Sequence, residues 1–506
     1  MIAGFSGAFV LIIASMRAFV VVNANLNDAL SAAAWSSRVR TISSCINNIF
    51  SCRRFHISTV LEQLAAFHTY FPETTMIMDD LDLTFGIELE FICVYPQGIF
   101  EPILGANAEQ SAGNYIFCSM RQNGVPATGH EDDDEIFACD LPSYSSWRVE
   151  DDKLVLSAGE RAYVPAGCSV EAIELSSRKF RYAELCGPRA THEIATVFGI
   201  LKELQNLGCV ILTNQSTGFH THVGNGEEKV PLRTAKNLLK LVSAFERCFD
   251  QIHTAPRIAI PETFSYNGGE YNHCYAPPSF FHANNAFAED NQTMSGRLAV
   301  IDATDDYEGL GSLFSCDLPE LGDILGPDDR THGKLSAYNF DNLFPSNDYD
   351  RCEEDLKRTI EFRQHAGTVN YEEVMAWIML TCQLVRFSHT ATDEQITELC
   401  GDSGDLNVGL VNVLRAIELP EVAIQHYADR LSPAVNTVQS ENIALLRRAL
   451  QAGFAHPMQA LIAQNAIEEH DRFASEVVKE AIQKKAMDGC YGVGFGWSRA
   501  ELEEFA

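Results

Sequence analysis

The stretch TIEFRQHAGT at residues 359–368 has the pattern of a β-strand with two different faces. Side chains alternate across a strand, so residues two apart share a face. The pattern therefore places Glu361, Arg363 and His365 on one face. The opposite face carries the apolar pair Ile360 and Phe362. We expect the apolar face to be buried against helices and the charged face to line a cleft.

Two other stretches have the same design. In FGIELEF, Glu88 and Glu90 share one face, and the residues that alternate with them are apolar. In GFHTHVG, His220 and His222 share a face in the same way. If the three strands belong to one sheet, their polar faces combine carboxylates, imidazoles and a guanidinium. Gathering charges in this way is unfavourable unless a counter-ion is bound.

Periodicity elsewhere predicts both strands and helices. We expect further strands at 147–156, 162–175, 209–212 and 335–344. We expect helices at 191–207, 231–252 and 372–389, followed by more helices up to about residue 487. The segment 262–330 is rich in Gly, Pro, Asn and Asp and has little periodicity, which predicts a loop system.

Composition narrows the class of protein. The 506 residues include 37 basic and 69 acidic ones, so the net charge is −32. A surface this acidic repels a phosphate backbone, and we therefore predict no nucleic-acid partner. The 15 cysteines form no C-x-x-C pair, which disfavours a zinc ribbon and a dense disulfide framework. We expect reduced, buried thiols in a cytoplasmic protein.

The first 78 residues leave three interpretations open. Residues 1–22 are apolar, but Arg17 interrupts them, whereas a spanning helix needs about 20 uninterrupted apolar residues. Residues 31–58 carry four arginines and no acidic residue, as in a transit peptide. We favour a poorly ordered extension at 1–78, with a signal or transit segment as the alternative, and we do not expect membrane attachment.

The combined polar faces suit a metal ion together with a phosphate. Carboxylate oxygens with an imidazole are ligands for Mg²⁺ or Mn²⁺. Arg363 suits a planar anion such as a phosphate or a carboxylate. Phosphoryl transfer needs both, because its catalysis depends on positioning and on neutralising charge. The sequence contains no P-loop, no Rossmann fingerprint and no G-x-S-x-G elbow.

Each motif also has a structural interpretation. A Glu-x-Glu pair is often a solvated strand face, and Glu361 with Arg363 is often an ion pair within a strand. His220 and His222 could instead be two ligands of zinc in a hydrolase, although no third ligand stands at a familiar spacing. The three motifs together, each with an apolar alternate face, favour a functional site.

The series FGIELEF (85–91), STGFHTHVG (216–224) and TIEFRQHAGT (359–368) resembles the fungal amidoligase family. That family belongs to the carboxylate–amine ligase superfamily, with glutamine synthetase and γ-glutamylcysteine ligase. Shorter matches run from Trp147 to Asp152, at Ala183-Glu184 and at 337–340. The chain departs at Cys186-Gly187, where the family usually has Val or Ile and then Ser before a proline.

The resemblance implies an α+β fold with a glutamine-synthetase-like core, in which a mainly antiparallel, curved sheet presents a concave polar face and carries helices on its back. It implies ATP with Mg²⁺ (or Mn²⁺), an acyl-phosphate intermediate and attack by an amine. The implied metal ligands are Glu88, Glu90, Glu184, His220 and Glu361. Arg363, with His220 nearby, would bind the phosphate, and His222 or His365 would act as the base.

The implied substrates are a carboxylate and an amine, each a small molecule or a peptide, and an oligomer is left open. The segment 262–330 would close over the site, with candidate substrate contacts at Tyr266, Asn267, Tyr271 and His273. We expect a catalytic domain at 79–392, C-terminal helices at 393–488 and an acidic tail at 489–506. The alternatives are a degenerate relative that binds a nucleotide or a peptide, and the zinc hydrolase.

Overall fold

The computed structural model describes residues 81–105, 109–128, 144–186, 188–258, 294–313, 337–344, 356–405, 407–454, 456–473 and 475–487. These residues belong to one compact unit. None of the helices within them is long and apolar enough to cross a bilayer. The predicted extension 1–78, the tail 489–506 and the candidate substrate contacts Tyr266, Asn267, Tyr271 and His273 lie outside the described residues.

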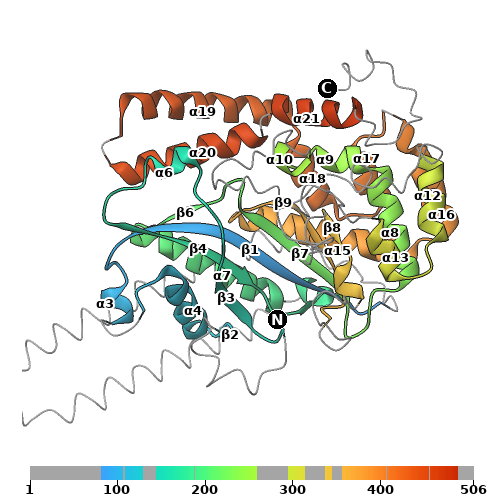
Figure 1. The fold of residues 1–506 in the computed structure, drawn as a ribbon, viewed down its shortest axis with the longest axis horizontal. Helices are drawn as coiled ribbons and strands as arrows, with labels where there is room; N and C mark the ends of the chain where they lie inside the picture. Colours follow the sequence, from blue (N-terminus) through green and yellow to red (C-terminus); the bar gives the residue numbers. More distant parts are fainter. Residues whose placement is uncertain are drawn as a thin grey trace, which may run out of the picture. The chain divides into compact units, whose positions relative to one another are not determined.

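A single mixed sheet organises the described residues (Figure 1). Its strands are β1 (Leu83–Pro96), β2 (Ala127–Thr128), β3 (Trp147–Asp151), β4 (Cys168–Ser176), β5 (Phe180–Arg181), β6 (Val210–Leu212), β7 (Gly218–Asn225), β8 (Tyr338–Asn339) and β9 (Thr359–Ala366). Their order is β2-β3-β4-β1-β7-β9-β8, and β5 and β6 also pair with β1. All described pairs are antiparallel except β2 with β3. The predictions of an α+β fold and of a mainly antiparallel sheet are therefore confirmed.

Helices surround this sheet. They are α3 (Glu101–Leu104), α4 (Ala112–Gln122), α6 (Ala158–Arg161), α7 (Pro188–Leu207), α8 (Leu232–Ala244), α9 (Glu246–Asp250), α10 (Ala255–Ile258), α12 (Met294–Ala303), α13 (Tyr307–Ser312), α15 (Tyr371–Thr390), α16 (Asp393–Gly401), α17 (Leu410–Ala416), α18 (Glu421–Arg430), α19 (Pro433–Ala452), α20 (Pro457–Phe473) and α21 (Ser475–Met487). Short 3₁₀ turns lie at Tyr182–Cys186, Asp341–Leu343 and Asp402–Gly404. The Asn370 side chain caps α15, accepting hydrogen bonds from the first-turn amides of Glu372 and Glu373.

One face of the sheet is apolar and buried under helices. Along β1, the alternate residues Phe85, Ile87 and Leu89 are each only 1% exposed. They share one core with residues of α4, α7 and α15. In Figure 1, α4 and α7 lie alongside β1, β3 and β4, and α15 contacts β1 and β7. Apolar alternation along the strands thus provides the buried face that the sequence predicts.

The opposite face of β1 changes character along the strand. Glu88 and Glu90 come first, and Ile92 and Val94 follow on the same face. The apolar pair packs with β6 and with Leu461 of α20. The α20 helix therefore covers the end of this face that carries Ile92 and Val94. The end that carries Glu88 and Glu90 is not part of this apolar cluster.

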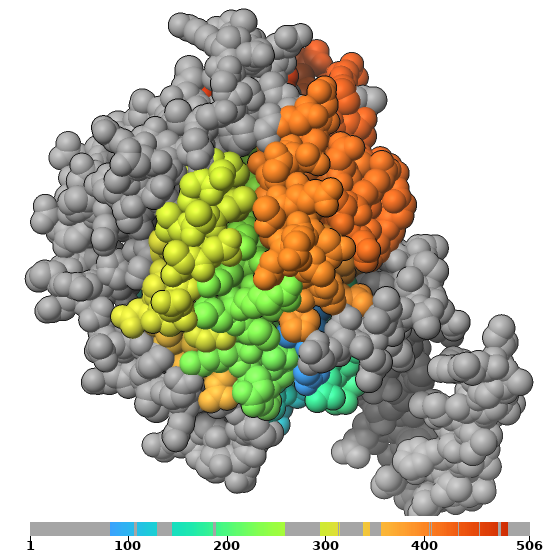
Figure 2. Space-filling view, turned by 90° about the vertical axis from the view of Figure 1, so that its right-hand side faces the viewer, coloured from blue at the N-terminus to red at the C-terminus, as the bar shows by residue number. Residues whose placement is uncertain are grey.

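Several predicted elements differ from the structure. Of the predicted strand 147–156 only Trp147–Asp151 (β3) forms, and in the described part of 335–344 only Tyr338–Asn339 (β8) is a strand. The predicted helix 231–252 divides at Phe245 into α8 and α9, because Phe245 leaves the helical region (φ −110, ψ 16). The predicted strand 162–175 is shorter and shifted: it is β4, preceded by α6. The prediction of a loop system across 262–330 is wrong for α12 and α13. Figure 2 shows these yellow residues beside the green α8, against which α12 packs, so tertiary contact supports a helix with little periodicity of its own.

Candidate functional site

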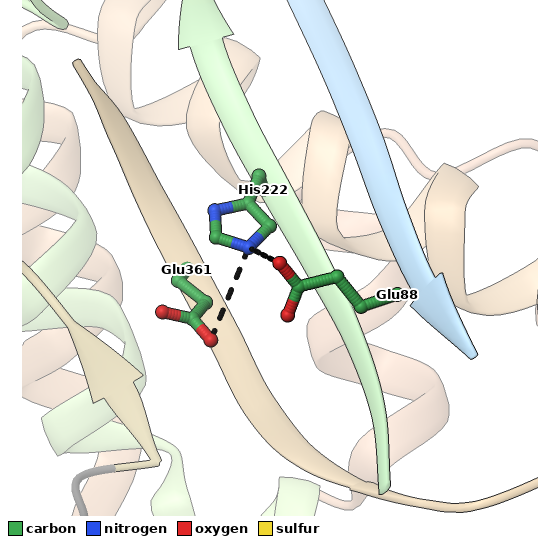
Figure 3. A group of neighbouring side chains, drawn as sticks. All are labelled: Glu88, His222 and Glu361. Atoms are coloured by element: carbon green, nitrogen blue, oxygen red, sulfur yellow. Dashed lines mark hydrogen bonds and ion pairs between the residues drawn. The ribbon is translucent and has the colours of Figure 1, made fainter. Parts of the chain in front are cut away.

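The registers of β1, β7 and β9 bring three of the predicted residues together (Figure 3). Glu88 lies directly opposite His220, and Glu361 lies directly opposite His222. Paired residues on adjacent strands share a face, so carboxylates of the two outer strands converge on the imidazoles of the central one. His222 Nε2 is 2.9 Å from Glu88 Oε1 and 3.9 Å from Glu361 Oε1. One ligand atom from each of these three side chains lies within 4.8 Å of the others, which makes this group a candidate cation site.

A second group of acidic side chains lies beside the first. Glu174 of β4 is directly opposite Glu90 of β1, and Asp152 follows β3. Their carboxylate oxygens also lie within 4.8 Å of one another. Burial, together with the charges of Glu88 and Glu90, raises the pKa of Glu174 to about 8, and burial raises that of Asp152 as well. Like charges opposite each other destabilise a sheet, so this group also fits a bound cation.

His220 lies between the two groups and is 1% exposed. Its Nδ1 is 3.2 Å from Glu88 Oε2 and 3.6 Å from Glu90 Oε1. Its Nε2 is buried and has no hydrogen-bond partner. A Cβ at position 218 would lie 2.5 Å from this nitrogen, so Gly218 provides the room for the imidazole. A buried ring nitrogen without a partner is costly, and a metal ion is one ligand that would satisfy it.

Two cationic side chains neutralise part of the negative charge. Lys357 Nζ is 3.0 Å from Glu88 Oε1, and Arg363 forms an ion pair with Glu361. Burial opposes ionisation of Glu88, but Lys357 and His222 outweigh it and hold the pKa of Glu88 well below its usual range. Against the same effect of burial, Arg363 and His222 lower the pKa of Glu361 to about 2. Both carboxylates are therefore ionised and able to bind a cation.

Hydrogen bonds to neutral groups orient the first candidate site. Asn339 Nδ2 of β8 donates to Glu361 Oε2 at 2.8 Å. His222 Nδ1 lies 3.1 Å from Thr359 Oγ1, so its other nitrogen faces Glu88 and Glu361. Such outer partners fix the orientation of ring and carboxylate ligands in metal sites.

His365 does not share the face of Glu361, and this expectation is wrong. Phe362 pairs with Thr221 and His365 pairs with Phe219, so β9 advances three residues while β7 advances two. This β-bulge turns His365 to the apolar side, where its ring contacts Phe219 and Trp377 at centroid distances of 5.4 and 5.1 Å. Burial lowers the pKa of His365 to about 4, so it is neutral at pH 7.

The bulge is held by an arginine that sequence analysis did not single out. Arg257 of α10 donates to the backbone carbonyl of Arg363 at 3.1 Å and to that of Thr217 at 2.7 Å. These bonds satisfy carbonyls at the irregular part of the β7–β9 pairing. No local pattern in the sequence could reveal this contact, because Arg257 lies far from β9 in the chain.

The structure does not bring Glu184 into either group. Its Oε2 is 3.5 Å from Arg178, whose Nε also lies 2.9 Å from Glu193. Glu174, Lys357 and Asp152 are the charged neighbours that sequence analysis did not assign to the site. For Glu174 a signal existed, since it alternates with the apolar Ile173 and Leu175 along β4.

A separate cavity of 1090 Å³ lies among α15, α18, α19, α20 and α21. Its described lining includes none of the predicted site residues. The convergent charges on the sheet therefore form a site distinct from this cavity.

Comparison with known protein families finds a match to part of the chain. Residues 81–310 match a family model described as "Putative amidoligase enzyme". The matched segment begins with β1 and contains Glu88, Glu90, Glu174 and His220. No curated protein matches the chain. The family description suggests an enzyme that forms amide bonds.

Proposed function

We propose that the chain is an ATP-dependent ligase that joins a carboxylate to an amine through an acyl phosphate, with Mg²⁺ or Mn²⁺ as cofactor. The observation that supports the proposal is the convergence of charged and titratable side chains on one face of the sheet. They are Glu88, Glu90, Asp152, Glu174, His220, His222, Glu361 and Arg363. This face lies in and next to the segment that is similar to amidoligases.

The donor atoms fit a hard divalent cation. The first group would hold it through Glu88, His222 and Glu361. The second group would hold it through Glu90, Asp152 and Glu174. His220 adds a further imidazole, whose Nδ1 lies 3.2 Å from Glu88 Oε2 and 3.6 Å from Glu90 Oε1. A set dominated by carboxylate oxygens favours Mg²⁺ or Mn²⁺ over zinc. A bound cation would supply neutralising charge for the phosphates and for the substrate carboxylate.

Arg363 fits the position of a phosphate clamp. Its side chain is 14% exposed and pairs with Glu361, which is itself a candidate cation ligand. Its Nε is buried and has no hydrogen-bond partner, so a donor remains for an anion. A guanidinium can bind two oxygens of one phosphoryl group, and it would offset the charge that develops when the substrate carboxylate attacks the γ-phosphorus of ATP.

His222 fits a ligand better than a base. Its Nε2 faces Glu88 and Glu361, and its Nδ1 faces Thr359. A nitrogen that is bound to a metal ion cannot accept a proton from the amine. The base predicted at His365 is also disfavoured, because that ring lies among apolar side chains on the other face of the sheet.

ATP turnover tests the proposal. Purified full-length protein is incubated with ATP, Mg²⁺ or Mn²⁺, and pooled carboxylates and amines, and ADP and phosphate are measured. We expect turnover that needs both substrate pools and that falls at least about a hundredfold in Arg363→Ala. Arg447→Ala, which changes an exposed arginine on α19, is the matched control. Release of phosphate that is independent of the amine, or equal activity of the two variants, would count against the proposal. Tightly bound zinc would support the hydrolase alternative.

A further inference from the structure

The ammonium group of Lys357 stands where a cation would stand. Lys357 Nζ is 3.0 Å from Glu88 Oε1, the same oxygen that lies 2.9 Å from His222 Nε2. The Lys357 side chain is 36% exposed, whereas that of Glu88 is 14% exposed. The ammonium therefore reaches the carboxylate from the rim of the site, on a long flexible chain that can also point elsewhere.

The backbone next to Lys357 is held in an uncommon conformation. Arg358 has a φ of +57, a region that few residues other than glycine adopt. Its backbone N–H donates to the carbonyl of Asn342 at 2.9 Å, and its side chain donates to the carbonyl of Glu227 at 2.6 Å. Two separate contacts thus anchor the chain as it enters β9, so Lys357 starts from a fixed position beside the site.

The ammonium and a divalent cation cannot share this position. A cation held by Glu88, His222 and Glu361 would share the Glu88 carboxylate with Lys357 Nζ, and like charges on one carboxylate repel in a partly buried site. The ammonium must therefore leave Glu88 when the cation binds. A phosphate of a nucleotide bound to the same cation would be a suitable new partner, since lysine is a common phosphate ligand.

We propose that Lys357 is a nucleotide-binding residue that alternates between two anions. Without a cation it neutralises Glu88; with the cation in place it contacts the phosphates of ATP. Cation binding then frees the ammonium for the nucleotide, and nucleotide binding removes a competitor of the cation. The two affinities are coupled reciprocally through one side chain. This inference rests on the proposed function, and it adds a residue that the phosphate clamp at Arg363 does not include.

Metal titration tests the first half of the proposal. Mn²⁺ binding is measured by electron paramagnetic resonance, without nucleotide, for wild type, Lys357→Met, Lys357→Arg and the surface control Lys202→Met. We expect Lys357→Met to bind Mn²⁺ about fivefold more tightly, because the competing charge is gone. Lys357→Arg and Lys202→Met should stay close to wild type. A purely structural lysine would give the opposite sign or no change.

Nucleotide titration tests the second half. In saturating Mn²⁺, we expect Lys357→Met to bind a non-hydrolysable ATP analogue about tenfold more weakly than wild type. Unchanged or weaker Mn²⁺ binding by Lys357→Met overturns the competition, and unchanged analogue binding overturns the phosphate contact. If wild type itself binds no Mn²⁺, the cation site fails and the proposed function falls with the inference. If only the role of Lys357 is wrong, wild type still binds Mn²⁺.

Discussion

At the scale of residues, Glu88 is the centre of the site. It contacts His220 and His222 of β7 and Lys357 at the entrance to β9, so one carboxylate links three separate segments of the chain. The arrangement balances burial against opposite charge, and that balance keeps Glu88 ionised. Burial raises the pKa of Glu174, and its acidic neighbours add to the effect, whereas the cationic neighbours of Glu88 outweigh burial and lower its pKa.

Glu174→Gln should stabilise the protein without metal while weakening cation binding. The pKa of Glu174 rises from 4.5 to about 8 on folding, so its ionisation costs stability as the pH increases through this range. We expect the variant to gain on the order of 1–3 kcal/mol at pH 8 and little at pH 5. Urea unfolding in a chelator at both pH values measures this, and Mg²⁺ should stabilise wild type more than the variant. A variant less stable than wild type at pH 8 would contradict the account.

His365 should make stability fall in mild acid. Its pKa drops from 6.5 to about 4 on folding, so the contribution of the neutral ring is complete above pH 6.5 and is lost as the pH falls toward 4. The loss is at most roughly 3 kcal/mol. We expect His365→Gln to show a flatter pH dependence of the free energy of unfolding between pH 6.5 and 4, whatever its stability at pH 7. Parallel curves for the two proteins would show that another group controls this range.

Strand alternation predicted the shared face of Glu88, His220, His222 and Glu361, because alternation is a local property of the backbone. It failed for His365, because the bulge depends on pairing with β7 and on Arg257, which is distant in the chain. Glu184 was assigned by resemblance alone, and the structure pairs it with Arg178. The catalytic and ligand roles of all these residues remain predictions.

At the scale of elements, α20 covers the apolar end of the sheet face that also carries Glu88 and Glu90. Its Leu461 packs with Ile92 and Val94 of β1. Asn465, one turn further along, donates to the buried Glu160 of α6 at 2.7 Å. The α20 helix thus packs on the same face of β1 that carries Glu88. This contact was not predicted from the sequence.

Leu461→Ala should destabilise the protein more than the same substitution at the neighbouring residue, Ile462→Ala. Leu461 is fully buried, whereas Ile462 is 52% exposed. We expect Leu461→Ala to cost about 2–5 kcal/mol and Ile462→Ala to change stability by less than about 1 kcal/mol. Chemical unfolding of the full-length variants gives both values. Equal losses at the two positions would mean that α20 does not pack on the sheet in this orientation.

Periodicity predicted α7, α15 and the central strands, since each carries a long stretch with one apolar face. It missed α4, and it misjudged α12, whose helix is supported by contact with α8. The division between α8 and α9 was also missed, because a single residue that leaves the helical region does not interrupt the apolar pattern.

At the scale of the molecule, the sheet and the C-terminal helices share one core. Ile396 of α16 and Tyr427 of α18 belong to the same buried cluster as Phe85 of β1. The predicted boundaries at 78/79, 392/393 and 488/489 stay predictions. Because the sheet and the C-terminal helices share a core, the experiments use the full-length protein. The family match ends at residue 310 and therefore does not include β9 with Glu361. Pairing with β7 places β9 beside the matched part of the chain.

Metal-dependent nucleotide binding tests whether the polar face of the sheet is the nucleotide and metal site. Calorimetric titration of a non-hydrolysable ATP analogue is compared with Mg²⁺ and with a chelator, for wild type and for Glu88→Ala/Glu90→Ala. We expect wild type to bind the analogue only with Mg²⁺, and the double variant, folded by circular dichroism, not to bind it. Binding by wild type in the chelator, or equal Mg²⁺-dependent binding by the double variant, would contradict the claim that this face of the sheet is the nucleotide and metal site.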